Sequence, residues 1–382
     1  MSGMTLNLPG GAVTLVAGPA PEATGTWNRT AYAAAHVVAD PLANVDPWMG
    51  VAVDWDRTLA FREHLWGLGF GVAEAMDTAQ RGMGLDWPTS LELIRRSTDL
   101  ARAGGHLIAS GAGTDHLAPG PDVTLDSVIR AYEEQCEAVE AAGSRVILMA
   151  SRALARAARS PDDYHRVYSR ILSGLSQPAI LHWLGEAFDP ALEGYWGSAD
   201  HMAAMDTAVQ VIEANAAKVD GIKISLLSAE KEIAMRRRLP EGVLMYTGDD
   251  FNYPDLIAGD EQGHSHALLG IFDPIAGAAA RALSQLSAER MGDYAATFAP
   301  TVPLSRHIFK APTRFYKTGV VFMAYLNGHQ DHFTMVNGQE SARSTLHLAE
   351  IVQLANAAGL FTDPERAAAR ARTVLAARGL AA

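Results

Sequence analysis

Cysteine, clustered basic residues and long apolar runs are all scarce in this chain of 382 residues, and each shortage excludes a class of protein. The one cysteine, Cys136, excludes a disulfide framework within the chain, and its place in a helical pattern argues against a thiolate nucleophile. No block of lysine and arginine is present, and the formal net charge is −12. Nucleic acid is therefore not expected as a partner.

Targeting and membrane segments are also missing. The first residues, M-S-G-M-T-L-N-L-P-G, lack a charged region followed by a long apolar one, and no run approaches the roughly 18 apolar residues of a spanning helix. We therefore expect a soluble cytoplasmic protein with no membrane partner. Hydrophobic residues form 48% of the chain and charged residues 19%, which is typical of a globular protein with a sizeable core.

Short apolar runs alternate with amphipathic segments from residue 31 onward, which is the pattern of repeated βα units around a parallel sheet. Asp54 is placed as the N-cap of one helix, and Ser160 as the N-cap of another that starts with Pro161. The predicted strands are 31–38, 70–76, 106–111, 145–150, 178–184, 219–227, 243–248 and 265–272.

These repeats predict a closed (β/α)8 TIM barrel, because eight βα units spread over about 250 residues match its size. An open doubly wound sheet is the alternative, but no G-x-G-x-x-G follows the first strand. Beyond residue 286 long helical patterns continue without strands. We expect an N-terminal extension (1–30), a catalytic barrel (31–286) and a C-terminal helical extension (287–382) that covers part of the barrel or forms an oligomer interface.

The strand V-D-G-I-K-I-S-L-L (219–227) contains one lysine, Lys223. Side chains alternate along a strand, so Ile222 and Ile224 fall on one face while Lys223 and Ser225 fall on the other. In a closed barrel the apolar face packs against the helices, so Lys223 points inward near a carboxyl end, where barrel enzymes place catalytic groups. Burial lowers the pKa of an ammonium group, and the neutral amine can then attack a carbonyl carbon to form a Schiff base.

Polar residues follow the other predicted strands at the same rim and provide candidate partners for this lysine. His182 is the candidate proton shuttle, since an unperturbed imidazole has a pKa of about 6.5. Arg81 is a candidate clamp for a substrate carboxylate. The predicted substrate-binding residues are His36, Glu74, Asp77, Gln80, Arg81, Asp249, Asp250 and Asn252.

Three motifs give the chain a family resemblance: G-I-K in the sixth strand, P-A-I-L-H in the fifth and Y-T-G-D-D at the seventh. The chain resembles the dihydrodipicolinate synthase and N-acetylneuraminate lyase superfamily of class I aldolases. It is more closely similar to an uncharacterised bacterial family described only as dihydrodipicolinate-synthase-like. The resemblance implies a Schiff base at Lys223 and a homodimer or homotetramer.

The departures from that superfamily concern the substrate. His182 stands where the superfamily has a tyrosine proton relay, and the arginine that usually follows this strand is missing. A-M-D-T-A-Q-R-G replaces the G-T-T-G-E loop that holds a keto acid, with Thr78 as a loose match. These differences indicate a carbonyl compound other than pyruvate and make lysine biosynthesis an unexpected role.

Three functional hypotheses follow. The leading one is a Schiff-base lyase, an aldolase or dehydratase, that acts on a polyhydroxylated keto sugar or keto sugar acid without a cofactor or metal. The second is an isomerase or epimerase that holds a divalent metal through Glu74, Asp77, His182 and Asp249, although no compact ligand motif lies at a strand end. The third is a barrel without catalysis that serves in binding or assembly.

Overall fold

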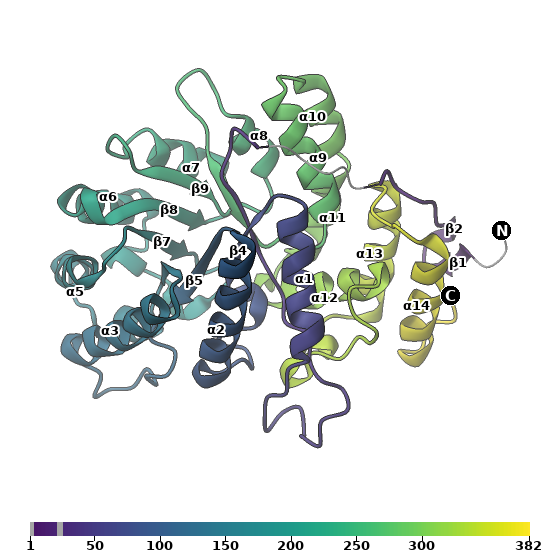
Figure 1. Cartoon of the computed structure of the whole chain (residues 1–382), viewed down its shortest axis with the longest axis horizontal. Helices are drawn as coiled ribbons and strands as arrows, with labels where there is room; N and C mark the ends of the chain where they lie inside the picture. The colour runs from purple at the N-terminus through teal and green to yellow at the C-terminus, as the bar shows by residue number, and fades with distance from the viewer. Residues whose placement is uncertain (1–3, 21–25) are drawn as a thin grey trace.

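A closed barrel of eight parallel strands forms one end of the molecule in the computed structural model, which describes residues 4–20 and 26–382 (Figure 1). The order around the barrel is β10-β3-β4-β5-β6-β7-β8-β9. Every predicted strand is present, so the barrel prediction is confirmed. The strands are β3 (Ala31–Ala34), β4 (Gly71–Glu74), β5 (Ile108–Ala112), β6 (Arg145–Met149), β7 (Ala179–Leu184), β8 (Val219–Ser225), β9 (Leu244–Thr247) and β10 (His266–Leu269).

A helix follows each strand and packs on the outside of the barrel, as expected for βα units. Asp54 caps α1 through a hydrogen bond from the Arg57 amide, as the sequence predicts. α5 also begins at Pro161 as predicted, but the side chain of Ser160 makes no capping hydrogen bond. The helices are α1 (Trp55–Gly67), α2 (Trp87–Gly104), α3 (Leu125–Ala142), α4 (Arg152–Ala157), α5 (Pro161–Gly174), α6 (His201–Ala214), α7 (Ala229–Arg236), α8 (Tyr253–Ala258) and α9 (Ala276–Ser287).

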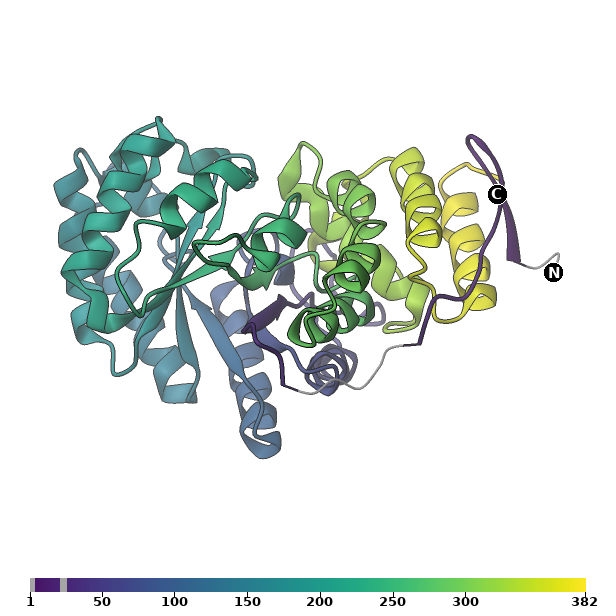
Figure 2. The same ribbon diagram turned by 90° about the horizontal axis from the view of Figure 1, so that it is seen from above.

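Helices alone make up the chain after α9, as predicted. They form a second body beside the barrel, and Figure 2 shows the two lying end to end. Short 3-10 turns connect some of these helices. The helices are α10 (Met291–Phe298), α11 (Thr301–Ile308), α12 (Tyr316–Asn327), α13 (Thr345–Ala357) and α14 (Pro364–Ala377).

The hairpin at the start of the described chain packs on this helical extension. An antiparallel hairpin of β1 (Thr5–Leu8) and β2 (Gly11–Thr14) contacts α14. Arg372 donates to the carbonyl of Thr5 at 2.7 Å, and Gln353 donates to the carbonyl of Pro9 at 2.9 Å. The hairpin and the last helix, α14, therefore lie at the same end of the molecule (Figure 1).

Two apolar clusters show how the strands are oriented. The smaller one fills the barrel interior and includes Tyr32, Ile147 and Tyr246. The larger one lies between strands and helices and includes Ile222 and Ile224. The two isoleucines therefore face the helices, as strand alternation predicts. Within the described residues, no helix has the length and apolar character needed to cross a membrane.

Candidate active site around Lys223

Lys223 lies in a small chamber at the carboxyl end of the barrel. It occupies the second half of β8, and its side chain is only 7% exposed. The alternation that sends the neighbouring isoleucines outward brings this lysine inward, as predicted. The chamber is lined by side chains from five strand ends and from the helical extension: Ala34, Met76, Asp77, Thr78, Leu184, Phe188, Ser225, Asp250 and Tyr316, together with Gly270.

Gly248 creates the space that the lysine side chain occupies. A Cβ atom at this position would lie 2.7 Å from Lys223 Cε, 2.4 Å from Ser225 Oγ and 2.5 Å from the carbonyl oxygen of Ile224. No ordinary side chain is compatible with these distances. The glycine of the T-G-D-D motif therefore lets β9 approach the reactive lysine closely.

The electrostatic environment favours a neutral amine at Lys223. Burial lowers the pKa of the lysine, and the carboxylates of Asp250 and Asp77 oppose this shift only in part. Burial also raises the pKa of Asp250 to about 7, against the opposing effect of Lys223. Asp250 accepts a hydrogen bond from the amide of Ile271 at 2.9 Å, which fixes its position. Burial therefore favours the neutral form of both side chains, an amine at Lys223 and a carboxylic acid at Asp250.

His182 lies beside Lys223, because the two residues are paired in register on β7 and β8. Its Nε2 is 3.3 Å from Ser225 Oγ, and its buried Nδ1 has no hydrogen-bond partner among the described residues. Burial, aided by Lys223, lowers the pKa of His182 well below 6.5. His182 is therefore a neutral imidazole at neutral pH, and the ordinary histidine pKa on which its expected role relied does not apply here.

A hydroxyl pair that the sequence analysis missed also reaches the chamber. Tyr316 is the first residue of α12, and its hydroxyl oxygen lies 2.8 Å from Thr78 Oγ1. Gly270 at the end of β10 makes room for this pair, because a Cβ there would lie 3.2 Å from the tyrosine ring and 3.3 Å from Thr78 Oγ1. The helical extension thus contributes a hydroxyl directly to the barrel mouth.

A larger pocket of about 240 Å³ adjoins the Lys223 chamber, and Asp77 and Leu184 line both. His182 forms part of its wall. Polar groups line the rest of the pocket mouth: Arg81, Thr114, Asp115, Ser151, Arg152 and Asp189. Asp77 therefore lies where a substrate bound in the pocket meets the chamber of the lysine, and its carboxylate forms no ion pair within the described residues.

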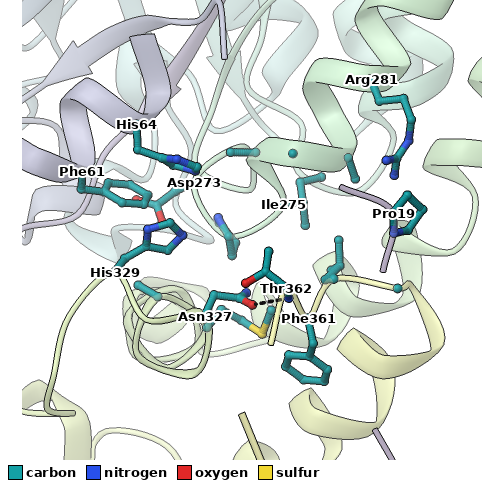
Figure 3. Close-up of a pocket in the computed structure, with 18 residues that line it drawn as sticks. Pro19, Phe61, His64, Asp273, Ile275, Arg281, Asn327, His329, Phe361 and Thr362 are labelled. Carbon is teal, nitrogen blue, oxygen red and sulfur yellow. Dashed lines mark hydrogen bonds between the residues drawn. The ribbon is translucent and has the colours of Figure 1, made fainter. Parts of the chain in front are cut away.

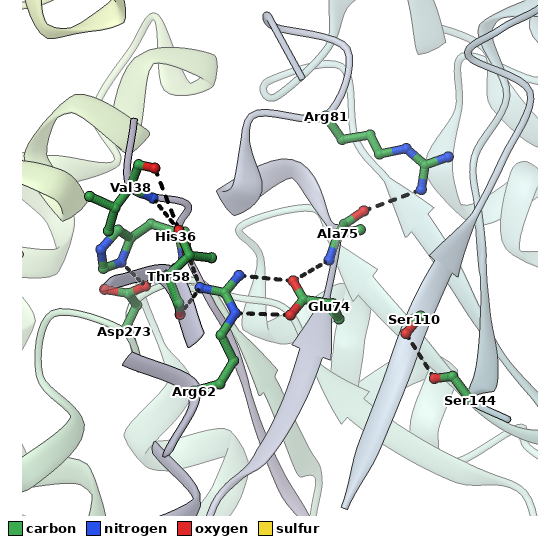
Figure 4. Close-up of polar contacts among 10 residues, drawn as sticks. All are labelled: His36, Val38, Thr58, Arg62, Glu74, Ala75, Arg81, Ser110, Ser144 and Asp273. Atoms are coloured by element: carbon green, nitrogen blue, oxygen red, sulfur yellow. Dashed lines mark hydrogen bonds and ion pairs between the residues drawn. The ribbon is translucent and has the colours of Figure 1, made fainter. Parts of the chain in front are cut away.

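Glu74 and Arg81, both predicted to bind substrate, are instead bound within the protein. Arg62 donates to both oxygens of Glu74 at 2.9 Å, and neither side chain is exposed to solvent (Figure 4). Burial alone would raise the pKa of Glu74, but the charge and hydrogen bonds of Arg62 hold it below its usual value. Arg81 donates to both oxygens of Asp115, at 2.7 and 3.1 Å, and to the carbonyl of Gly111 at 2.6 Å. Both groups are therefore bound within the protein, and of the two only Arg81 lines the larger pocket.

Gln80 and His36 are also occupied. Gln80 donates to the carbonyl of Val336 at 2.8 Å, which attaches the β4 loop to the helical extension. His36 Nδ1 lies 2.8 Å from Asp273 Oδ2, and the backbone amide of His36 donates to the same oxygen at 2.8 Å (Figure 4). Its ring packs on Phe61 of α1. These residues fix the rim of the barrel and do not line the chamber of Lys223.

Asp249 and Asn252 form the turn that follows β9. Asp249 accepts hydrogen bonds from the amides of Phe251 at 2.9 Å and Asn252 at 3.1 Å, and from the Asn252 side chain at 2.8 Å. Glu74, Asp77, His182 and Asp249, the ligands of the metal hypothesis, are not brought together. Across residues 4–20 and 26–382, no group of three or more His, Cys, Asp or Glu side chains is placed to hold a metal ion.

Comparison with known proteins gives a family and a fold. Residues 13–380 match a family described as protein of unknown function (DUF993), and no curated protein matches the chain. Dihydrodipicolinate synthase from Aquifex aeolicus is similar over 87% of this chain and 98% of its own, with a TM-score of 0.66 and 10% identity. Dihydrodipicolinate synthase from Oceanobacillus iheyensis is similar over 85% of this chain and 96% of its own, with a TM-score of 0.62 and 13% identity.

A third similar structure is the chloride-inhibited dihydrodipicolinate synthase from Acinetobacter baumannii, complexed with pyruvate. The similarity extends over 88% of this chain and 100% of the Acinetobacter baumannii chain, with a TM-score of 0.64 and 15% identity. At such identities the likeness shows a common fold. The fold of the superfamily that the sequence motifs indicate is therefore confirmed, and the chemistry must be argued from this chain's own residues.

Proposed function

We propose that this chain, which belongs to the family described as protein of unknown function (DUF993), is a lyase that forms a Schiff base through Lys223. The observation that carries the proposal is the buried lysine at the carboxyl end of a barrel strand, next to a pocket open to a substrate. The shared fold with dihydrodipicolinate synthases supports the same class of reaction. The proposed substrate is a polyhydroxylated keto sugar or keto sugar acid.

The first step is the attack of the neutral Lys223 amine on the substrate carbonyl. Its lone pair forms a C–N bond, the carbonyl oxygen takes up one proton and the nitrogen loses one, which gives a neutral carbinolamine. A second proton on that oxygen lets it leave as water while the nitrogen lone pair forms the C=N bond of a protonated Schiff base. Asp250 is suited to supply and recover these protons, because its pKa of about 7 allows both protonation states near neutral pH.

The Thr78–Tyr316 pair is suited to the proton transfers that follow. Its two hydroxyls are already hydrogen-bonded to each other, and both residues line the chamber of Lys223. Each hydroxyl can accept one proton as it donates another, so the pair can relay a proton without becoming charged. Burial also raises the pKa of Tyr316 well above its usual value, which keeps the phenol protonated.

Bond cleavage needs a group that accepts a proton from the substrate, and Asp77 is the proposed base. Its position between the chamber and the larger pocket places it beside the part of the substrate that continues from the imine. As Asp77 takes up a hydroxyl proton, the hydroxyl oxygen would form a C=O bond, the adjacent C–C bond would break, and its electron pair would pass into the protonated C=N group to give an enamine. His182, neutral and with a free Nδ1, would accept a hydrogen bond from a substrate hydroxyl.

The size and lining of the larger pocket support a substrate with several hydroxyl groups. Thr114 and Ser151 form a hydroxyl pair in its wall at 2.5 Å, and Asp189 and Arg152 form an ion pair at its mouth. These groups offer hydrogen-bond donors and acceptors to hydroxyls. Within this pocket the Arg81 guanidinium is occupied by Asp115, while Arg152 binds Asp189 through Nε.

Reductive trapping tests the proposal. The protein is incubated with a panel of keto sugars and keto sugar acids, with pyruvate included for comparison, and reduced with borohydride. Intact mass should increase by the mass of one reduced adduct for at least one substrate. Lys223→Ala should abolish the increase, while Lys310→Ala, an exposed lysine outside the pocket, should leave it unchanged. Equal trapping by the Lys223→Ala protein would refute the proposal.

We also propose that the protein forms a homodimer or homotetramer. Three large apolar side chains are exposed in the segment between β3 and α1: Leu42 at 91%, Trp48 at 78% and Met49 at 85%. Light scattering after gel filtration would give the mass in solution, and a monomer at all concentrations would contradict this part of the proposal.

A further inference from the structure

A second cavity, of about 70 Å³, lies between the barrel and the helical extension. Its walls come from α1, the start of α9, α12 and the segment before α14, with Pro19 at one edge (Figure 3). Among the described residues, none lines both this cavity and either of the pockets beside Lys223. The cavity is therefore a separate site, and the proposed reaction makes no use of it.

One side of this cavity is suited to an anion. The first turn of α9 lines it, and no hydrogen bond within the described part of the chain uses the amides of Ala276, Gly277 or Ala278. Arg281 lies one turn further along the same helix, and its Nη1 is buried without a hydrogen-bond partner among the described residues. Free amides at a helix N-terminus and an adjacent guanidinium together form a site for a carboxylate.

The opposite side is suited to a primary ammonium group. Asp273 is 3% exposed and binds His36 through Oδ2, while its Oδ1 is buried without a partner among the described residues. His64 and His329 lie next to each other there, with ring centroids 4.5 Å apart. Burial lowers the pKa of both imidazoles, that of His329 to about 3, so each is neutral and can accept a hydrogen bond.

Apolar side chains form one wall between the two sides, and Asn327 and Thr362, which are hydrogen-bonded to each other, also line the cavity. Figure 3 shows Arg281 and Asp273 across the cavity from each other, with Ile275 between them. Met323 and Leu360 also contribute to the lining. A hydrocarbon portion between the charged ends of a ligand would pack on this apolar wall, whereas Asn327 and Thr362 already bind each other.

We propose that this cavity binds a small ω-amino acid, with its ammonium group at Asp273, His64 and His329 and its carboxylate at the start of α9 and Arg281. Each buried, unpaired polar atom would then gain a partner of opposite charge or matching hydrogen-bond character. Because the cavity touches both bodies of the protein, its ligand would fix the helical extension, which carries Tyr316, against the barrel. This site goes beyond the proposed lyase activity and does not depend on it.

Isothermal titration of the full-length protein tests this site with 3-aminopropanoate, 4-aminobutanoate and 6-aminohexanoate. Butylamine and butanoate each lack one of the two charges and serve as ligand controls. We expect one zwitterion of the series to bind at least tenfold more tightly than either control, because each control gives up a set of hydrogen bonds to a charged group. Lys223→Ala should bind equally well, which separates this test from that of the lyase.

Two variants identify the ends of the site. Arg281→Gln should weaken binding by about tenfold or more, while Arg290→Gln, a change to an exposed arginine nearby in the sequence, should have no effect. Asp273→Asn should remove the preference for the zwitterion over butanoate. If the Asp273→Asn variant does not fold, the comparison of Arg281→Gln with Arg290→Gln still tests the proposal. Failure of all three zwitterions to bind, or binding that is indifferent to Arg281→Gln, would overturn the proposal.

Discussion

Gly248→Ala is the substitution that most directly perturbs the space around Lys223. The added methyl would lie 2.7 Å from Lys223 Cε and 2.5 Å from the carbonyl oxygen of Ile224, where carbon atoms do not normally approach. The lysine side chain can rotate away, but the backbone of β8 cannot yield without loss of its pairing with β9. Overpacking of this kind costs about 1–3 kcal/mol of unfolding free energy.

Gly248→Ala should affect the rate of adduct formation at Lys223 more strongly than it affects the unfolding free energy. Displacement of a reacting group by about 1 Å can cost on the order of 10²-fold in rate, so adduct formation at Lys223 should slow by about 10- to 100-fold. Urea denaturation measures the first effect, and the rate of borohydride trapping measures the second, at a temperature where the variant is fully folded.

A matched glycine provides the control. Gly292 lies in α10, and a Cβ there would meet nothing within 4 Å. Gly292→Ala should leave trapping unchanged and alter stability by less than about 1 kcal/mol, with a gain expected because alanine is the better helix former. If Gly248→Ala trapped substrate at the rate of the unmodified protein, the close approach of β9 to Lys223 would not limit the position of the amine, and the reasoning would be refuted.

Four further predictions concern charges and hydroxyls at the carboxyl end of the barrel. Arg62→Met should lower the unfolding free energy by about 3–5 kcal/mol in urea, because it leaves the buried Glu74 unpaired. The pKa of Glu74 is lowered in the folded state, so the stability it contributes should be present above pH 4.5 and lost as the pH falls through the lowered value. Asp250→Asn should shift the pH profile of trapping at Lys223 to lower pH, since the carboxylate raises the pKa of the lysine; an unchanged profile would contradict the pairing. Tyr316→Phe should slow turnover by on the order of 10²-fold while costing only about 1 kcal/mol of stability, and kinetics compared with thermal unfolding would separate the two.

The barrel and the direction of Lys223 could be predicted because both depend on periodicity along the chain. Apolar runs of strand length recur between helical patterns, and each run became a strand. Alternation within V-D-G-I-K-I-S then separated the isoleucines from the lysine, and the closed barrel left the lysine only an inward direction.

The partners of the polar residues could not be predicted, because they depend on contacts between distant parts of the chain. Glu74 follows a strand end as a catalytic carboxylate would, yet Arg62 on α1 neutralises it. Tyr316 reaches the chamber from a helix beyond the barrel, and nothing in its local sequence distinguishes it from a core tyrosine. His182 was identified at the correct place, but only its burial shows that its pKa is lowered.

A second buried lysine makes the assignment of the nucleophile open to direct test. Lys317 on α12 is 4% exposed, and burial lowers its pKa to about 8, with Asp77 among the groups that oppose the shift. Peptide mapping of the borohydride-reduced adduct by mass spectrometry distinguishes the two lysines. The modification should be found on the peptide that contains Lys223. An adduct on Lys317, or on no lysine with any carbonyl compound of the panel, would contradict the central claim that Lys223 is the nucleophile.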